Sequence, residues 1–434
     1  MAPPTMALND DSELAPARRF PKIAMLVSRF PKVNDTYQLR EMNALEKMGV
    51  PIELFSLVHH QEGTVHDEAK SLDSRAHYFK LLSPEVIKAQ LTWLRRDPSG
   101  YLAAWKWGIR ENKSAPDFFL RTFVLTPIAA AMALRMEALG IEHVHAHFAT
   151  YPTHAALVIK RLTGIPYSFT GHAHDIQVRH EGLQDKLAEA EFYFCCTRDG
   201  AEQLRLSFGE AAESKGHVVY HGLDIDQFRF LEPNPDHGDR PLRIVVVASF
   251  EPCKGHAYLI EACRILKQRG IETEVKLIGG ELANAPGFLD ELKQQTNSAG
   301  LSDSIDFVGK VNSTKVREWI EWSDIGCLAC CRAPDGHQDG IPNFLTECLS
   351  SGRPVVSSLQ AGVMELVTDG VEGLLVRTRD SEALAGALQR MKEHPELRAE
   401  MGRAGRDKVE REHNVTVNTN RLHEIYLEEV GRDI

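Results

Sequence analysis

The densest cluster of polar residues able to do chemistry lies in residues 335–354, D-G-H-Q-D-G-I-P-N-F-L-T-E-C-L-S-S-G-R-P. Pro342 suits the start of a helix, where the missing N–H is not needed, and Gly352 suits its end. The N-terminus of such a helix offers free N–H groups and a positive dipole end, which together favour a phosphate. Asp339 precedes the helix and Glu347 lies in it, so we expect both carboxylates to face one pocket there.

The elements that must position this cluster are predicted from hydrophobic patterns. Short β-branched apolar runs alternate with helical patterns along the chain, which is typical of parallel α/β sheets. The alternation predicts two doubly wound, Rossmann-like lobes with the active site in the cleft between them, outside the carboxyl ends of the strands. Strands are expected at residues 23–27, 53–58, 143–147, 167–170, 192–197, 217–220, 242–248, 274–278, 304–308, 325–329, 354–357 and 373–376. No strand is followed by G-x-G-x-x-G at a helix start, which argues against a nicotinamide-dependent dehydrogenase.

The domain organisation follows from composition. Residues 1–20 read as a disordered leader, and residues 21–230 as the first, acceptor-side lobe. The polar, proline-bearing stretch 231–241 is the predicted linker. Residues 242–415 form the predicted donor lobe, and a helix over 416–434 is expected to cross back to the first lobe.

Composition excludes several classes of function. The chain has 434 residues, 43% of them hydrophobic and 26% charged, with a formal net charge of −11. That charge excludes a generally basic nucleic-acid-binding protein. Eight cysteines, including two adjacent pairs, do not resemble a disulfide framework, so a reducing compartment is expected. Cys327 and Cys330 form a C-x-x-C that favours buried structural thiols, with a metal or redox site as the alternative.

A basic segment, residues 88–121, departs from this acidic background. It holds seven basic residues against three acidic ones, interleaved with tryptophan and phenylalanine. It therefore predicts either contact with an anionic membrane or a packed helical insertion near residues 85–135. The longest apolar run, residues 122–134, is too short to span a bilayer, and Pro127 interrupts it. With no visible secretory signal, we expect a cytoplasmic protein, peripheral on the inner face of the plasma membrane.

Histidines mark the ends of two predicted strands. His143, His145 and His147 alternate and therefore share one face of a strand, where they either pack as polar groups or bind zinc. His172 and His174 follow the strand predicted at residues 167–170, on the cleft side of the first lobe.

The spacing of Asp339 and Glu347, with seven residues between them, resembles the E-x7-E element of retaining GT-B glycosyltransferases. The chain resembles glycosyltransferase family 4, especially the branch that builds exopolysaccharide and capsule repeat units. The likeness covers most of residues 21–425. It also rests on S-R-F-P-K-V-N-D-T-Y (28–37), V-H-A-H-F (144–148), S-F-T-G-H-A-H-D-I (168–176), V-V-Y-H-G-L-D-I-D-Q-F (218–228) and K-G-H-A-Y-L-I-E-A (254–262).

The resemblance implies a GT-B fold and a catalytic set of His172, Asp339 and Lys254. Glu347 would hold the ribose hydroxyls of a sugar nucleotide, and Asp339 would touch the donor sugar. Lys254 would neutralise the pyrophosphate, while His172 would contact the sugar from the opposite lobe. Further donor-binding positions implied are Ser249, Gly340, Ile341, Asn343 and Phe344, and acceptor or cleft positions are Ser28, His147, His174 and Asp175.

The implied reaction moves a sugar from a nucleoside diphosphate sugar to a glycolipid or polyprenyl-linked saccharide. A UDP-sugar is the expected donor. The acceptor hydroxyl would attack from the side the nucleotide leaves, and the departing phosphate would take its proton. No metal or other cofactor is expected, because a lysine and a helix N-terminus supply the positive charge. Asp224 and Asp226 have D-x-D spacing, but the match of G-L-D-I-D-Q-F makes them a lobe-closing turn.

Two departures from the family pattern matter. The family places an arginine five residues before the lysine, whereas this chain has Ser249, so Arg243, Arg332 or Arg353 must substitute or donor affinity is lower. The first glutamate of the element is an aspartate here. A nucleotide-sugar epimerase or hydrolase, and a non-catalytic subunit of a glycosyltransferase complex, are the alternative functions.

Overall fold

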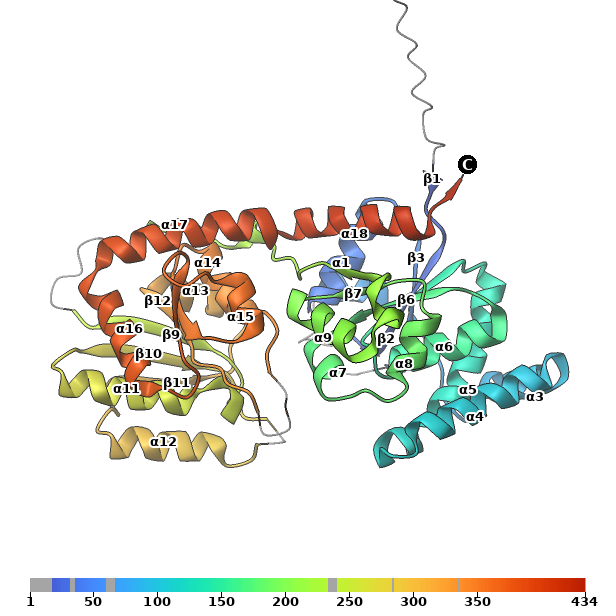
Figure 1. The fold of residues 1–434 in the computed structure, drawn as a ribbon, viewed down its shortest axis with the longest axis horizontal. Helices are drawn as coiled ribbons and strands as arrows, with labels where there is room; N and C mark the ends of the chain where they lie inside the picture. Colours follow the sequence, from blue (N-terminus) through green and yellow to red (C-terminus); the bar gives the residue numbers. More distant parts are fainter. Residues whose placement is uncertain are drawn as a thin grey trace, which may run out of the picture.

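Two parallel sheets, of seven and six strands, form two lobes that lie side by side (Figure 1). The computed structural model describes residues 18–31, 36–59, 67–232, 240–282, 285–333, 336 and 338–433. Helices flank both sheets, so the strands are buried on both faces and consist largely of apolar residues. The predicted fold class, two doubly wound α/β lobes, is confirmed.

The sheet of the N-terminal lobe has the order β4-β3-β2-β5-β6-β7-β8, and all of its strand pairs are parallel. The chain reverses its direction of winding between β2 and β5, which makes their carboxyl ends the switch point of this sheet. Its strands are β2 (Ile23–Phe30), β3 (Ile52–His59), β4 (His77–Tyr78), β5 (His143–His147), β6 (Tyr167–Gly171), β7 (Tyr193–Cys195) and β8 (Gly216–Val218). Its helices are α1 (Thr36–Lys47), α2 (Asp67–Asp73), α3 (Pro84–Arg96), α4 (Pro98–Asn112), α5 (Pro116–Leu139), α6 (Tyr151–Thr163), α7 (Ala173–Gln177), α8 (Leu183–Glu189), α9 (Arg198–Phe208), α10 (Glu210–Glu213) and the 3₁₀ turn η1 (Ile225–Gln227).

The sheet of the C-terminal lobe has the order β11-β10-β9-β12-β13-β14, and its switch point lies between β9 and β12. Its strands are β9 (Leu242–Val247), β10 (Thr273–Ile278), β11 (Ile305–Gly309), β12 (Ile325–Leu328), β13 (Val355–Ser358) and β14 (Gly373–Val376). Its helices are η2 (Pro252–Lys254), α11 (His256–Gln268), α12 (Phe288–Ser298), α13 (Ser313–Trp322), α14 (Asn343–Ser350), α15 (Ala361–Leu366), α16 (Ser381–Glu393) and α17 (Pro395–Glu412).

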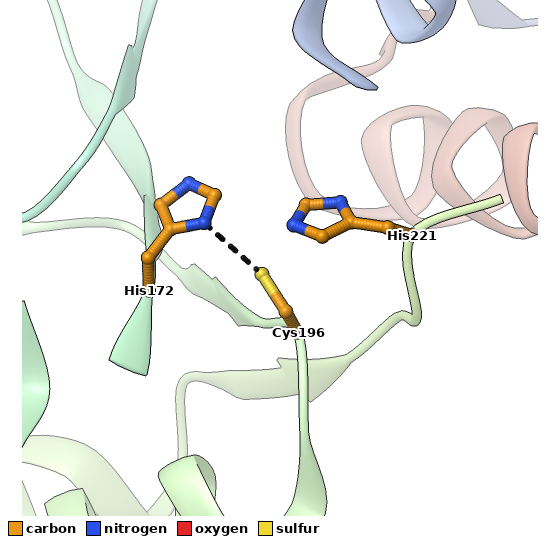
Figure 2. Close-up of side chains that lie close together, drawn as sticks. All are labelled: His172, Cys196 and His221. Carbon is orange, nitrogen blue, oxygen red and sulfur yellow. Dashed lines mark hydrogen bonds between the residues drawn. The ribbon is translucent and has the colours of Figure 1, made fainter. Parts of the chain in front are cut away.

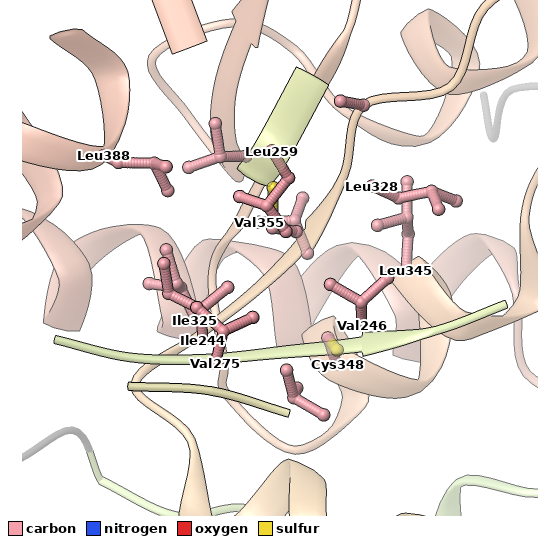
Figure 3. Packing of buried hydrophobic residues seen from close by; sticks show 14 of the residues in the cluster. Ile244, Val246, Leu259, Val275, Ile325, Leu328, Leu345, Cys348, Val355 and Leu388 are labelled. Atoms are coloured by element: carbon pink, nitrogen blue, oxygen red, sulfur yellow. The ribbon is translucent and has the colours of Figure 1, made fainter. Parts of the chain in front are cut away.

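The core of the C-terminal lobe packs the inner strands against the helices. Figure 3 shows Ile244, Val275 and Ile325 of adjacent strands together in this core, with Cys348 of α14 nearby. Cys327 is a buried free thiol of the same core. Burial raises the pKa of this thiol, so it stays protonated and packs as a small apolar group.

The last helices join the lobes. α17 lies along the C-terminal lobe and α18 (Val415–Val430) along the N-terminal one (Figure 1). Leu422, Ile425 and Tyr426 of α18 pack into a core cluster of the N-terminal lobe. At the end of the chain, β15 (Arg432–Asp433) pairs antiparallel with β1 (Arg18–Arg19). The leader was expected to extend to residue 20, but this pairing gives Arg18–Arg19 a place in a strand, and residues 1–17 lie outside the described residues.

Helices α3, α4 and α5 form the basic insertion. The sequence left two alternatives for this segment, contact with a membrane or a packed insertion, and the burial of Trp93 and Trp107 fits the packed one for these two side chains. Their indole N–H groups donate to Ala130 O at 2.8 Å and to Asp185 Oδ2 at 2.7 Å. These aromatic side chains therefore hold the helices on the lobe.

Helix α5 continues through Pro127, contrary to the expected interruption. It is the one helix among the described residues that is long and apolar enough to cross a membrane. Within its most apolar window, 56% of the residues are buried inside the fold. Burial of this face outweighs the loss of about 3 kcal/mol for a proline inside a helix.

Candidate functional site

Lys254 and Asp339 meet at the switch point of the C-terminal sheet. Lys254 ends the turn after β9, and Asp339 follows β12. Lys254 Nζ donates to Asp339 Oδ1 at 2.6 Å, and each side chain is 16% exposed. Gly255 makes this approach possible: its φ is +73°, and a Cβ there would lie 1.8 Å from Ala329 O. The turn therefore packs directly against the end of β12.

This ion pair leaves capacity for a ligand. Burial lowers the pKa of Lys254, but the neighbouring carboxylate of Asp339 outweighs it and the net shift is upward, so the ammonium stays charged. Asp339 Oδ2 is buried and has no hydrogen-bond partner among the described residues. A buried carboxylate oxygen without a donor is expensive, so the arrangement suits a ligand that brings a hydroxyl group. Ser249, at the family's arginine position, donates to Glu251 Oε1 at 2.5 Å.

Helix α14 begins beside this pair with no side-chain cap. Pro342 precedes the helix in extended conformation (φ −68°, ψ 119°), and Asn343 at its first position is exposed. Gly340 and Ile341 are partly exposed in the loop before it, whereas the Phe344 ring is buried in the core. Phe344 can therefore contact a ligand only through its backbone N–H group. Uncapped N–H groups next to a lysine make a site for a phosphate.

Glu347 lies one turn further along α14. Burial raises the pKa of its carboxyl to about 7, although the positive charges of Arg40 and Arg317 oppose this shift. Arg40 belongs to α1 of the opposite lobe, so Glu347 faces that lobe. A ligand hydroxyl that donates to this carboxyl would favour its ionised form.

Only one of the three arginines considered as replacements is well placed. Arg243 lies at the amino end of β9, with its guanidinium over the Trp322 ring. Arg353 precedes β13, again at the amino end of the sheet, and donates to backbone carbonyls. Arg332 follows β12 at the carboxyl end and is exposed, with its Nε donating to Gly336 O at 3.1 Å. The first two are therefore excluded by their position.

His172 lies in the opposite lobe, directly after β6. Its ring packs against Phe148 at a centroid distance of 4.3 Å and against Tyr37 at 5.3 Å. Its Nε2 atom is buried without a hydrogen-bond partner among the described residues. Burial holds the pKa of His172 well below its ordinary value, so the imidazole is neutral. Phe148 has a φ of +79°, an unfavourable conformation for an aromatic residue of the kind that clusters at functional sites.

A buried acid and a buried base hold the loop under His172. Asp175 Oδ2 accepts from Ala149 N at 2.5 Å, and its Oδ1 accepts from His172 N at 3.2 Å. Lys186 Nζ donates to Ala149 O at 2.8 Å, so both groups hold the peptide after Phe148. Asp175 is 1% exposed and both of its carboxylate oxygens accept from backbone N–H groups, so this side chain stabilises the loop.

A pocket of about 500 Å³ opens at the switch point of the N-terminal sheet. It is bounded by Ser28 of β2 and by Phe148 after β5, and it extends to Val124 of α5. Most of its wall is apolar, with Arg29 and Arg121 among its lining residues. This pocket adjoins the His172 ring through Phe148.

The remaining histidines have separate surroundings. His174 is exposed. His147 is buried, and its Nε2 lies 3.7 Å from Glu41 Oε1. His143 and His145 share the Ser168 hydroxyl at 2.7 and 2.8 Å, which accounts for polar side chains on this face of β5.

The two halves of the site approach each other through direct contacts between the lobes. Gln338 N, next to Asp339, donates to Gln177 Oε1 at the end of α7. Glu365 of α15 accepts from the N–H groups of Arg198 and Asp199 at 2.7 and 2.9 Å. These bonds hold the loop of Asp339 opposite the short helix that His172 precedes.

Comparisons with known proteins agree with this architecture. The profile of the family described as Glycosyltransferase Family 4 matches residues 43–227, and that of Glycosyl transferases group 1 matches residues 228–408. The chain is 26% identical to the amylovoran biosynthesis glycosyltransferase AmsK of Erwinia amylovora, over 93% of this chain and 98% of the relative. The fold resembles Anabaena HepE, solved in complex with UDP, with a TM-score of 0.69 and 16% identity, over 94% of this chain and all of that one. It also resembles a glycosyltransferase of Rickettsia africae, with a TM-score of 0.70 and 15% identity, over 94% and 99% of the two chains.

Proposed function

The chain belongs to glycosyltransferase family 4, a family of retaining enzymes, and from this premise we propose that it transfers a sugar from a UDP-sugar to a lipid-linked saccharide in cell-surface polysaccharide synthesis. Its relatives include enzymes of exopolysaccharide biosynthesis. The observation that carries the proposal is the ion pair of Lys254 and Asp339 beside the uncapped N-terminus of α14.

In the proposed donor complex, the diphosphate lies between Lys254 Nζ and the first N–H groups of α14. Asp339 Oδ2 accepts a hydroxyl of the donor sugar, and Glu347 accepts the ribose hydroxyls. The ion pair of Lys254 and Asp339 forms without a ligand, which supports a preorganised site. The choice of UDP as the nucleotide of the donor is supported by the structural likeness to HepE, which was solved with UDP.

The proposed reaction follows from where charge develops. The glycosidic bond to the diphosphate breaks, and the leaving phosphate gains negative charge that Lys254 and the α14 dipole stabilise. The acceptor hydroxyl attacks on the side from which the nucleotide departs and passes its proton to the leaving phosphate, so the configuration is retained. His172, neutral and fixed between aromatic rings, contacts the sugar from the opposite lobe. This mechanism draws on no metal or other cofactor.

The acceptor is proposed to enter through the pocket at the N-terminal switch point. Its apolar wall leads from exposed Val124 on α5 to Phe148, which packs on His172. Arg29 and Arg121 line the same pocket and would pair with the phosphate of a glycolipid or a polyprenyl-linked saccharide. The site would therefore take an acceptor with an apolar chain and an anionic head.

Helices α3, α4 and α5 are proposed to dock on the anionic cytoplasmic face of the membrane. Each of them presents exposed aliphatic or aromatic side chains: Ile87, Leu91, Leu94, Leu102, Ile109, Leu120, Phe123 and Val124. Lys88, Arg95 and Lys106 are exposed on the same helices and form no ion pair with any described residue. Aliphatic side chains and free basic groups together suit an anionic lipid surface.

The test is a transfer assay with the purified chain. UDP- and GDP-sugars are supplied with polyprenyl-diphosphate-linked saccharides in vesicles, and both nucleotide release and glycosylated product are measured. We expect one UDP-sugar to be consumed in proportion to the glycosylated product. NMR of that product should show that the anomeric configuration of the donor sugar is retained. Donor binding without turnover would instead support a non-catalytic subunit of a glycosyltransferase complex. Consumption of the donor in the absence of acceptor would support a nucleotide-sugar hydrolase or epimerase.

A further inference from the structure

Three side chains that follow three adjacent strands converge at the carboxyl edge of the N-terminal sheet. His172 follows β6, Cys196 follows β7 and His221 follows β8, and these strands are neighbours in the sheet. Figure 2 shows the three side chains pointing toward one another from separate strands. Their candidate ligand atoms all lie within 4.8 Å of one another, and His172 Nδ1 lies 3.5 Å from Cys196 Sγ.

One of these separations matches the geometry of a tetrahedral zinc ion. Zinc bonds to thiolate at about 2.3 Å and to imidazole at about 2.0–2.1 Å, which places a nitrogen and a sulfur ligand about 3.5 Å apart across a tetrahedral angle. The His172–Cys196 distance already has this value. The His221 nitrogen lies within 4.8 Å of the other two ligand atoms, so it must move closer for all three to bind one ion.

The surrounding rings hold the two imidazoles in position. His172 and His221 stack at 5.3 Å with an interplanar angle of 19°, and Tyr37 packs against His221 at 4.3 Å. Burial lowers the pKa of His221 to about 4, so both imidazoles are neutral, the form that binds metals. Cys196 is the only one of the eight cysteines that is not fully buried. Burial still raises the pKa of its thiol, so the thiol must lose its proton when a cation binds.

The other candidate cluster does not compete. Glu41, His145 and His147 also place ligand atoms within 4.8 Å of one another, but all three are buried. Both ring nitrogens of His145 are occupied by hydroxyl groups, at 2.8 Å from Ser168 and 3.0 Å from Thr170. That cluster therefore has only two free ligands.

We propose that His172, Cys196 and His221 bind one thiophilic divalent cation, with Zn²⁺ the best fit, and that the bound cation inhibits sugar transfer. Binding exchanges the Cys196 S–H bond for a sulfur–zinc bond and releases one proton to solvent. Three protein ligands leave the fourth position to water. The inhibitory part rests on the proposed function, since a His172 ring bound to zinc cannot contact the donor sugar.

The binding test uses Co²⁺ as a spectroscopic probe on the full chain, stripped with chelator. We expect one Co²⁺ per chain, a thiolate-to-cobalt charge-transfer band, and displacement of Co²⁺ by Zn²⁺. Cys196→Ser, which keeps the size of the side chain, should lose the band and bind Zn²⁺ at least about tenfold more weakly. His221→Ala should do the same, whereas Cys263→Ala, at a buried thiol of α11, should match wild type.

Absence of the band in wild type, or its persistence in Cys196→Ser, would overturn the site. Variants whose unfolding transitions match that of wild type are taken as folded. Cys196→Ala is a second variant that removes the thiol and tests the same loss of the band. In the transfer assay, Zn²⁺ should inhibit wild type and EDTA should restore it, while the residual activity of Cys196→Ser should resist zinc. Zinc binding without inhibition would contradict the inhibitory role alone. A chain that binds zinc but transfers no sugar would contradict the proposed function and leave the metal site standing.

Discussion

The carboxyl ends of the two sheets carry opposite chemistry. Between β9 and β12, Lys254 and Asp339 form an ion pair beside a bare helix N-terminus. Near β5 and β6, His172 is neutral and is fixed by aromatic rings. The first arrangement suits an anion that gains charge, and the second suits a neutral group whose position matters. Substitutions in the first should therefore weaken donor binding, whereas substitutions in the second should lower turnover at unchanged donor affinity.

The largest effect is expected on the charged side. Glu347→Gln should lower turnover by about 10²-fold or more and raise the KM for the donor, because one preorganised polar group is lost. Glu321→Gln, on the exposed surface of α13, is the matched control and should change neither constant. Turnover equal to wild type in folded Glu347→Gln would remove this carboxyl from the site.

The membrane-docking helices give the next largest effect. Arg95→Gln with Lys106→Gln should weaken binding to anionic vesicles by about thirtyfold, at about 1 kcal/mol for each basic residue. Arg96 and Arg110 are left unchanged because they pair with Glu137 and Asp185.

The matched control for this prediction carries Lys47→Gln with Lys293→Gln, which removes the same charge from other exposed surfaces. Flotation with vesicles at low salt measures binding. Equal loss in both double variants would show a response to net charge alone. Failure of wild type to bind anionic vesicles would make the three helices a packed insertion.

A smaller effect is expected on the neutral side. Asp175→Asn removes an acceptor from the loop under His172 and should lower kcat by about tenfold, with the donor KM within about twofold. Steady-state kinetics separate the two constants. A rise in donor KM without a change in kcat would show that this carboxyl does not act through His172.

The smallest effect concerns stability and pH. The pKa of Glu347 is about 7 in the folded chain and about 4.5 unfolded, so the folded state is penalised progressively as pH rises from 4.5 through 7. Glu347→Gln should therefore be more stable than wild type by about 1–2 kcal/mol at pH 8, after allowance for screening by solvent, and equal to it at pH 4.5. Urea unfolding at the two pH values measures the free energy of unfolding of both proteins. A difference between variant and wild type that is the same at both pH values would contradict a raised pKa of Glu347.

The charged side of the site was accessible to sequence reasoning because its signals are local. The spacing from Asp339 to Glu347 and the start signal at Pro342 predict a carboxylate pair at a helix N-terminus, and α14 begins one residue after that proline. The alternation of strands and helices likewise predicted the two parallel sheets.

The neutral side depends on contacts that no local pattern encodes. Phe148 combines a positive φ with packing of its ring on His172, and burial of Lys186 beneath the same loop depends on a helix distant in sequence. The surroundings of the tryptophans in α3 and α4 could not be decided from the sequence for a related reason. Their spacing is the same for a core face and a surface face, and only the pairing of Trp93 with α5 decides which is buried. Periodicity predicts which residues share one face of a helix, but not which element packs against that face.

The role of Lys254 can be measured directly by calorimetric titration of UDP into the full chain in the presence of EDTA. If Lys254 and the N-terminus of α14 supply the positive charge, wild type should bind UDP in chelator, and Lys254→Met should bind about ten- to hundredfold more weakly. The control Lys293→Met should bind as wild type does. Loss of wild-type binding in EDTA, with recovery on addition of Mg²⁺ or Mn²⁺, would contradict the metal-free site.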